Sequence, residues 1–183
     1  MNPLLDFAGL PRFDLIEPTD VRPAISQLLD EARAEVERLL KPDAPATWAD
    51  FAEPLQDNLE RLSRAWGIVG HLHSVNDIPP WREAYNALLP EVTRFYAELG
   101  QNLALFKRYQ ALAASAEFAT LSPARQRILQ VLAGDAVAVR QHVHALGTSH
   151  VDQHATGDQR REFLDAGDVP ATVAEVLVGL EAV

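Results

Sequence analysis

Apolar residues recur at steps of three and four positions along most of the first two thirds of the chain. This spacing places side chains on one stripe of a helix. It predicts helices at Pro18–Leu40, Asp50–Leu72, Trp81–Leu99 and Gln101–Leu112, with a shorter one after Ser122-Pro123. Short connections favour antiparallel neighbours. The expected fold is therefore all-α, a bundle-like set of antiparallel amphipathic helices.

Prolines and short polar residues predict where these helices begin and end. Thr19 or Asp20 is expected to cap the first helix, because their side-chain oxygens can accept hydrogen bonds from unpaired backbone N–H groups. Pro79 and Pro80 are expected to separate the second helix from the third, since proline disfavours helix in the residue before it and fits a first-turn position. Pro90 is expected to interrupt the third run.

The spacing of charged and aromatic side chains predicts which of them form ion pairs and which enter the core. Asp57 with Arg61, and Glu60 with Arg64, have the separation of helical ion pairs. Eight aromatic residues could form a peptide-binding surface, but their helical spacing favours a place in the core: Trp48, Trp66, Trp81, Tyr85, Phe95, Tyr96, Phe106 and Tyr109. Three acids could contact a substrate but are expected to be solvated: Asp77, Glu91 and Glu98.

The segment "GHLHSVNDIPP" holds two histidines at the expected junction of the second and third helices. His71 and His73 are two residues apart, so on a helix their side chains diverge by roughly 200°. Such a pair cannot chelate one ion together. We expect one histidine to be packed or hydrogen-bonded at the helix end and the other to be exposed.

Composition narrows the class of protein. The 183 residues, 48% of them hydrophobic, suit one domain of ordinary size with a sizeable core. The absence of cysteine excludes a disulfide scaffold and thiolate metal sites. A net charge of −10 argues against a nucleic-acid partner, which needs clustered basic residues. With neither a signal peptide nor a membrane-spanning run recognised, a cytoplasmic location is expected.

The strings "NPLL", "HLHSV", "REAY", "LLPEV" and "GQNLALFKRY" follow one another in a recognisable order. Together they resemble the N-terminal helical region of the thimet-type (M3) zinc oligopeptidases, closest to those of the bacterial oligopeptidase A type. The resemblance runs from Asn2 to about Leu132. It implies a cytoplasmic peptidase that cleaves short peptides inside a deep channel, with the N-terminal helices forming one wall that restricts entry.

The zinc motif of that family, H-E-x-x-H, does not occur in the chain. The nearest pattern is "HVDQH", in which His150 and His154 have the right spacing but Val151 stands where the general base is needed. His142 and His144 lie nearby, so a loose four-histidine metal site is an alternative to an adventitious cluster. No catalytic, cofactor-binding or metal residue is assigned, and zinc is expected only in the full-length family.

Residues 133–183 differ in composition from residues 1–132, which we take as an oligopeptidase-like helical domain. The second segment holds four of the six histidines and is rich in Val, Ala, Gly and Asp. One hypothesis is a tail read in a shifted frame, and its rival is a divergent C-terminal subdomain with a helix near Pro170–Leu180. Under the first, the chain is the beginning of a truncated peptidase, and this tail packs less well than the body.

Two functions follow. The first is a truncated oligopeptidase A-like chain that contributes the channel wall, lacks the catalytic zinc domain and is inactive alone; its partners would be short peptides or a complementary catalytic domain. The alternative is a stand-alone helical module that binds proteins or peptides, or regulates them, without enzymatic activity.

Overall fold

The structure of the protein is a computed structural model that describes residues 2–134. Over that range the chain forms helices and turns, with no strand. The helices are α1 (Pro18–Leu39), α2 (Glu53–Val75), α3 (Pro79–Gly100), α4 (Leu103–Ala113) and α5 (Pro123–Gly134). Four short turns accompany them: η1 (Pro3–Leu5), η2 (Phe13–Leu15), η3 (Trp48–Ala52) and η4 (Ala116–Thr120). The all-α prediction is confirmed.

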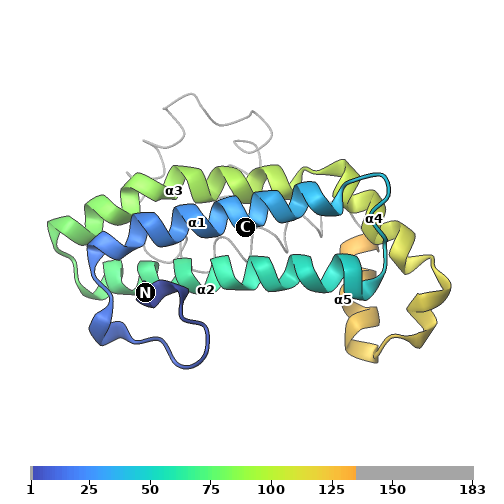
Figure 1. The fold of residues 1–183 in the computed structure, drawn as a ribbon, viewed down its shortest axis with the longest axis horizontal. Helices are drawn as coiled ribbons and strands as arrows, with labels where there is room; N and C mark the ends of the chain where they lie inside the picture. The colour runs from blue at the N-terminus through green and yellow to red at the C-terminus, as the bar shows by residue number, and fades with distance from the viewer. Residues whose placement is uncertain (1, 135–183) are drawn as a thin grey trace, which may run out of the picture. The chain divides into compact units, whose positions relative to one another are not determined.

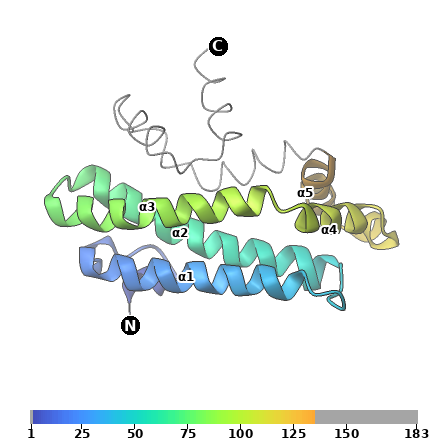
Figure 2. The same ribbon diagram turned by 90° about the horizontal axis from the view of Figure 1, so that it is seen from above.

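The three long helices α1, α2 and α3 lie side by side and run antiparallel in sequence order (Figure 1). Helices α4 and α5 lie at the end where α2 begins and α3 ends, as both views show (Figure 2). The predicted apolar stripes form the core between these helices, where Ile25, Leu29, Leu62 and Leu88 are fully buried. Among the described residues no polar or charged residue is buried.

The first helix begins at Pro18, as predicted, but its cap differs from the prediction. Its N-cap is Glu17, which is extended, and Pro18 occupies the first turn. Neither Thr19 nor Asp20 is the cap, since both lie inside the first turn. Asp20 instead accepts a hydrogen bond from the backbone N–H of Glu17 at 2.9 Å. The fixed φ of Pro18 suits the first helical position, so the helix starts there and not after it.

Helix α2 extends to Val75, three residues beyond the predicted end, and α3 begins at Pro79 instead of Trp81. The separation by prolines is confirmed, because Ile78 is extended with φ −110° and ψ 155°. Both Pro79 and Pro80 fit inside the first turn of α3, where their missing N–H groups have no helical partner to lose.

Pro90 does not interrupt α3, contrary to the prediction. The ring is exposed, while Leu88 and Val92 on either side are buried. A proline inside a helix removes one hydrogen bond and crowds the preceding turn. Core packing on both sides of Pro90 holds the helix together despite that loss.

A π turn, η3, leads directly into α2, and helical spacing does not reveal it. Thr47 caps it: the Oγ1 atom accepts a hydrogen bond from the N–H of Asp50 at 3.0 Å. Trp48, Phe51 and Ala52 of this turn are buried. Together with Leu55, these residues continue the buried face of α2 into the turn.

Candidate functional site

His71 and His73 point to different partners, as their spacing predicts. The exposed His71 ring meets Phe13 edge-on, with ring centroids 5.5 Å apart. The half-buried His73 ring stacks on Tyr85 of α3, with centroids 4.5 Å apart and an interplanar angle of 11°. No group of three or more His, Asp or Glu within residues 2–134 could hold a metal ion. The histidine cluster at 142–154 lies outside the described residues, as does the tail expected to pack less well.

The aromatic residues are core residues and not a peptide-binding surface, which confirms the interpretation from spacing. Seven of the eight are buried and Phe106 is half-buried. Tyr85 lies against both Trp66, at 4.8 Å between ring centroids, and His73. Burial raises the pKa of Tyr85, Tyr96 and Tyr109. These phenols therefore stay neutral near neutral pH and offer no ready base.

Two of the three candidate acids are exposed. Asp77 forms an ion pair with Arg82 at 2.7 Å between Oδ1 and Nη1, and Glu98 is exposed on α3. Glu91 is half-exposed on the same helix. The structure does not gather these carboxylates at one place with the histidines. The residues singled out for chemistry therefore do not form a catalytic constellation.

The described residues instead contain two structural junctions, one at each end of the bundle. The first is the N-terminal strap, defined here as residues 2–16. Asn2 donates a hydrogen bond to the carbonyl of Asp20 at 2.8 Å, and Leu4 is 1% exposed. Arg64 donates to the carbonyls of Phe7 and Gly9. The strap is thereby fixed along α2.

The ion pairs predicted within α2 are wrong, because both of their arginines contact other elements instead. Arg61 pairs with Glu31 of α1 at 2.9 Å and lies 5.0 Å from the centre of the Phe7 ring. Arg64 lies 5.9 Å from the same ring. Neither arginine forms its predicted pair with Asp57 or Glu60, because each reaches across to another element. Arg61 and Glu31 are 30 positions apart, and Arg64 and Phe7 are 57 apart. Residues so far apart carry no periodic signal, so spacing could not find these contacts.

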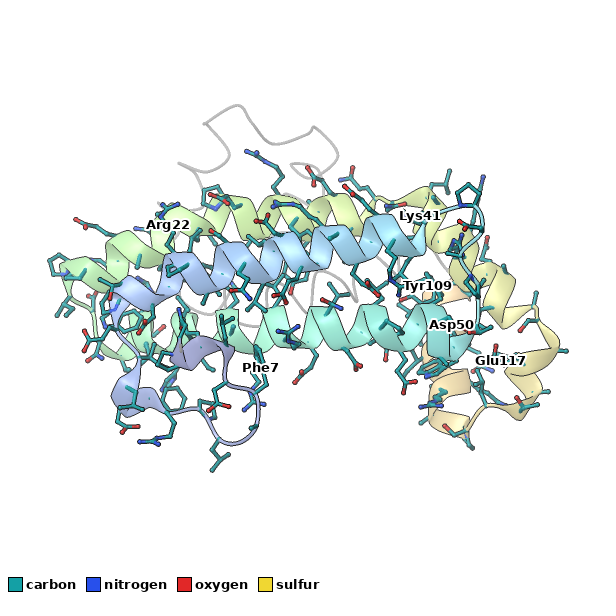
Figure 3. The ribbon with its side chains drawn as sticks, viewed as in Figure 1. Phe7, Arg22, Lys41, Asp50, Tyr109 and Glu117 are labelled. Atoms are coloured by element: carbon teal, nitrogen blue, oxygen red, sulfur yellow. The ribbon has the colours of Figure 1, made fainter. Side chains whose placement is uncertain are left out.

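The second junction joins α4 and α5 to the start of α2. Arg108 donates to the carbonyls of Lys41 and Ala44, just after α1 ends. The backbone N–H of Trp48 donates to the Glu117 carboxylate at 3.1 Å. Figure 3 shows Lys41, Asp50, Tyr109 and Glu117 at this end of the molecule, with Phe7 away from them on the strap.

Arg125 and Tyr109 complete this second junction. Arg125 pairs with Glu53 at 2.8 Å, and its guanidinium carbon lies 4.9 Å from the centre of the Trp48 ring. Phe51 packs on Tyr109 with ring centroids 4.8 Å apart. The π turn is therefore enclosed by side chains from both α4 and α5.

Exposed apolar side chains differ between the two ends. Six large hydrophobic residues of the described range are exposed, and five of them belong to the strap, to the last position of α2 or to the turn that follows it. We call these five the apolar end patch: Leu10 (90% exposed), Phe13 (45%), Leu15 (51%), Val75 (62%) and Ile78 (51%). The sixth, Leu103 at the start of α4, is 61% exposed.

Comparison with known proteins identifies the family. The family described as "Neurolysin/Thimet oligopeptidase, N-terminal domain" matches residues 25–141. The chain belongs to this family. Oligopeptidase A of Haemophilus influenzae is 40% identical over 129 residues, which are 70% of this chain and 19% of that protein. The resemblance to oligopeptidases is thus confirmed.

Two further relatives extend the comparison. Oligopeptidase A of Escherichia coli is 37% identical over 126 residues, covering 69% of this chain and 18% of its own length. "Organellar oligopeptidase A, chloroplastic/mitochondrial" of Arabidopsis thaliana is 37% identical over 138 residues, covering 75% and 17%. The chain therefore spans less than a fifth of the length of the curated relatives it matches. No helix of the described part is long and apolar enough to cross a membrane.

Proposed function

We propose that this chain supplies the N-terminal helical region of an oligopeptidase A-type zinc peptidase. In that assembly it forms one wall of the channel and restricts entry to short peptides. The observation that carries the proposal is the family match over residues 25–141, in a segment whose helices close around an apolar core. Cytoplasmic location, and short peptides or a catalytic part as partners, belong to the same proposal.

The described residues do not fit a peptidase zinc site. Such a site needs three protein ligands, an open position for water and a carboxylate that takes the proton from that water. His71 and His73 face Phe13 and Tyr85, and no third ligand joins them. In the proposed assembly the metal and the general base come from polypeptide beyond residues 2–134, and no chemical step is assigned to this range.

The contribution of these residues to the peptidase is mechanical. A wall that excludes folded proteins has to keep its shape when a peptide passes. The long antiparallel helices supply that rigidity through their continuous core, and the junction around Trp48 fixes α4 and α5 to them. Stability of the wall and selectivity for short peptides are therefore linked in this proposal.

The experiment compares the chain alone with a hybrid enzyme. In the hybrid, residues 2–132 replace the matching region of the Haemophilus influenzae oligopeptidase A. We expect the chain alone, with added zinc, to give only background hydrolysis of a quenched fluorescent peptide. We expect the hybrid to hydrolyse the same peptide in a chelator-sensitive manner, and to leave a folded protein substrate uncut.

Two results would contradict the proposal. One is a hybrid that is inactive while the parent enzyme is active under the same conditions. The other is chelator-sensitive turnover by the chain alone that disappears in a His150→Ala, His154→Ala double variant. That second result would move the active part of the chain to the histidines near its C-terminus.

A further inference from the structure

The exposed apolar side chains of the described range are concentrated at one end of the bundle. The strap and the turn between α2 and α3 both lie at that end (Figure 1). Phe13 connects them, because its ring contacts His71, which is one helical turn before Val75 on the same face of α2. Leu4 and Ile16 are buried and anchor the strap on either side of its three exposed apolar side chains.

The loop that carries Leu10 and Phe13 is held in place, although it is exposed. Arg64 holds the carbonyls of Phe7 and Gly9 at one side of the loop. Arg12 donates two hydrogen bonds to the Asp14 carboxylate at 3.1 and 3.0 Å. The N–H of Ala8 donates to Asp6 at 3.0 Å. A loop fixed before binding loses little conformational entropy when it docks.

The relatives are much longer than the region that this chain matches. In the Haemophilus influenzae oligopeptidase A, more than four fifths of the protein lies outside the matched region. A domain joined to so much further polypeptide buries part of its surface against it. A group of exposed apolar side chains marks a candidate surface for contact with other polypeptide.

We propose that the apolar end patch is the surface by which this domain docks onto the polypeptide that follows it in an oligopeptidase A-type protein. The inference rests on the proposed function and adds which face is buried. Leu10 and Val75 are chosen to test it, since they are the most exposed members of the patch and have the most surface to bury. Leu103 lies outside the patch and serves as a control of equal chemistry and similar exposure.

The test uses the hybrid enzyme with a specific protease site inserted after residue 132. After cleavage, the dissociation constant between the two parts is measured for the unchanged hybrid and for Leu10→Ser, Val75→Ser and Leu103→Ser. We expect the uncleaved variants to fold, and the isolated chain to keep its melting temperature, because all three side chains are exposed. Loss of the Leu10 or Val75 side chain is expected to weaken association about tenfold in each patch variant. Leu103→Ser is expected to change it less than about twofold.

The outcomes separate this inference from the proposed function. An inactive uncleaved hybrid would overturn both. If the uncleaved hybrid is active but its cleaved parts do not associate, or associate equally well in the patch variants, the docking surface is wrong and the proposed function stands. Weakening by Leu103→Ser alone would place the interface at the start of α4 and would also overturn the inference.

Discussion

The two ends of the bundle are held together by the same kind of hydrogen bonding but differ in the side chains that they expose. At each, an arginine from one helix donates to two backbone carbonyls of a distant segment: Arg64 holds the strap, and Arg108 holds the segment that follows α1. Around Arg108 the aromatic residues turn inward, and Trp48 and Phe51 are buried. Around Arg64 the segment keeps apolar residues outside. The second junction, around Arg108, closes a core, whereas the first, around the strap, presents a surface.

The largest effect on stability is expected from a substitution at the second junction, where the aromatic side chains are buried. Phe51→Ala removes a fully buried ring that packs on Tyr109. Such a truncation leaves a cavity and costs about 3–5 kcal/mol. Urea unfolding should report that loss in the free energy of unfolding. Phe13→Ala, in the strap at the other end, is the matched control. An equally large loss of unfolding free energy in that variant would contradict the contrast between the two ends.

Anchoring of the strap should be weaker but measurable. Leu4 is 1% exposed, and Leu4→Ala is expected to cost about 2 kcal/mol, at the low end for such truncations because a terminal segment can adjust. Amide hydrogen exchange over residues 3–16 should become faster, while exchange in α4 should not change. Unchanged exchange in the strap would show that Leu4 does not anchor it.

Substitution of the two arginines tests whether their hydrogen bonds to backbone carbonyls stabilise the two junctions equally. Arg64→Lys and Arg108→Lys keep the charge but lose the planar group that reaches two carbonyls at once. Each is expected to cost about 1 kcal/mol, and to speed exchange only at its own junction. Local exchange measured on both variants separates the effects. Global loosening in either variant would mean that the junctions are not independent.

The smallest effect is expected from the loss of one ion pair at low pH. The Arg38 guanidinium, hydrogen-bonded to Glu35 at 2.8 and 2.6 Å, holds the pKa of that carboxyl below its usual value of 4.5. The unfolded chain then binds the proton more readily, so this pair stabilises the protein at neutral pH and the stabilisation is lost as pH falls below about 4.5. Arg38→Ala should flatten the dependence of the unfolding free energy on pH only slightly, in the range where Glu35 titrates, because solvent screens an exposed pair. An unchanged slope would contradict the pairing.

Local patterns predicted the helices but not their junctions. Apolar spacing located α1 to α4 to within three residues at either end, because packing on one face imposes that spacing. It failed at Pro90, where tertiary packing outweighs the preference of proline. It placed Trp48 correctly in the core, but it did not reveal the π turn that begins there. The contacts of Arg64 and Arg108 join residues more than fifty positions apart, and no local pattern encodes them. The division at residues 132 and 133 stays a prediction.

Amide hydrogen exchange on the isolated chain and on the hybrid enzyme tests the contrast between the ends most directly. The account predicts that residues 8–15 and 75–78 gain protection in the hybrid, because they become buried against the rest of the peptidase. Residues around Leu103 should exchange alike in both proteins. An active hybrid in which residues 8–15 and 75–78 exchange as fast as in the isolated chain would contradict it.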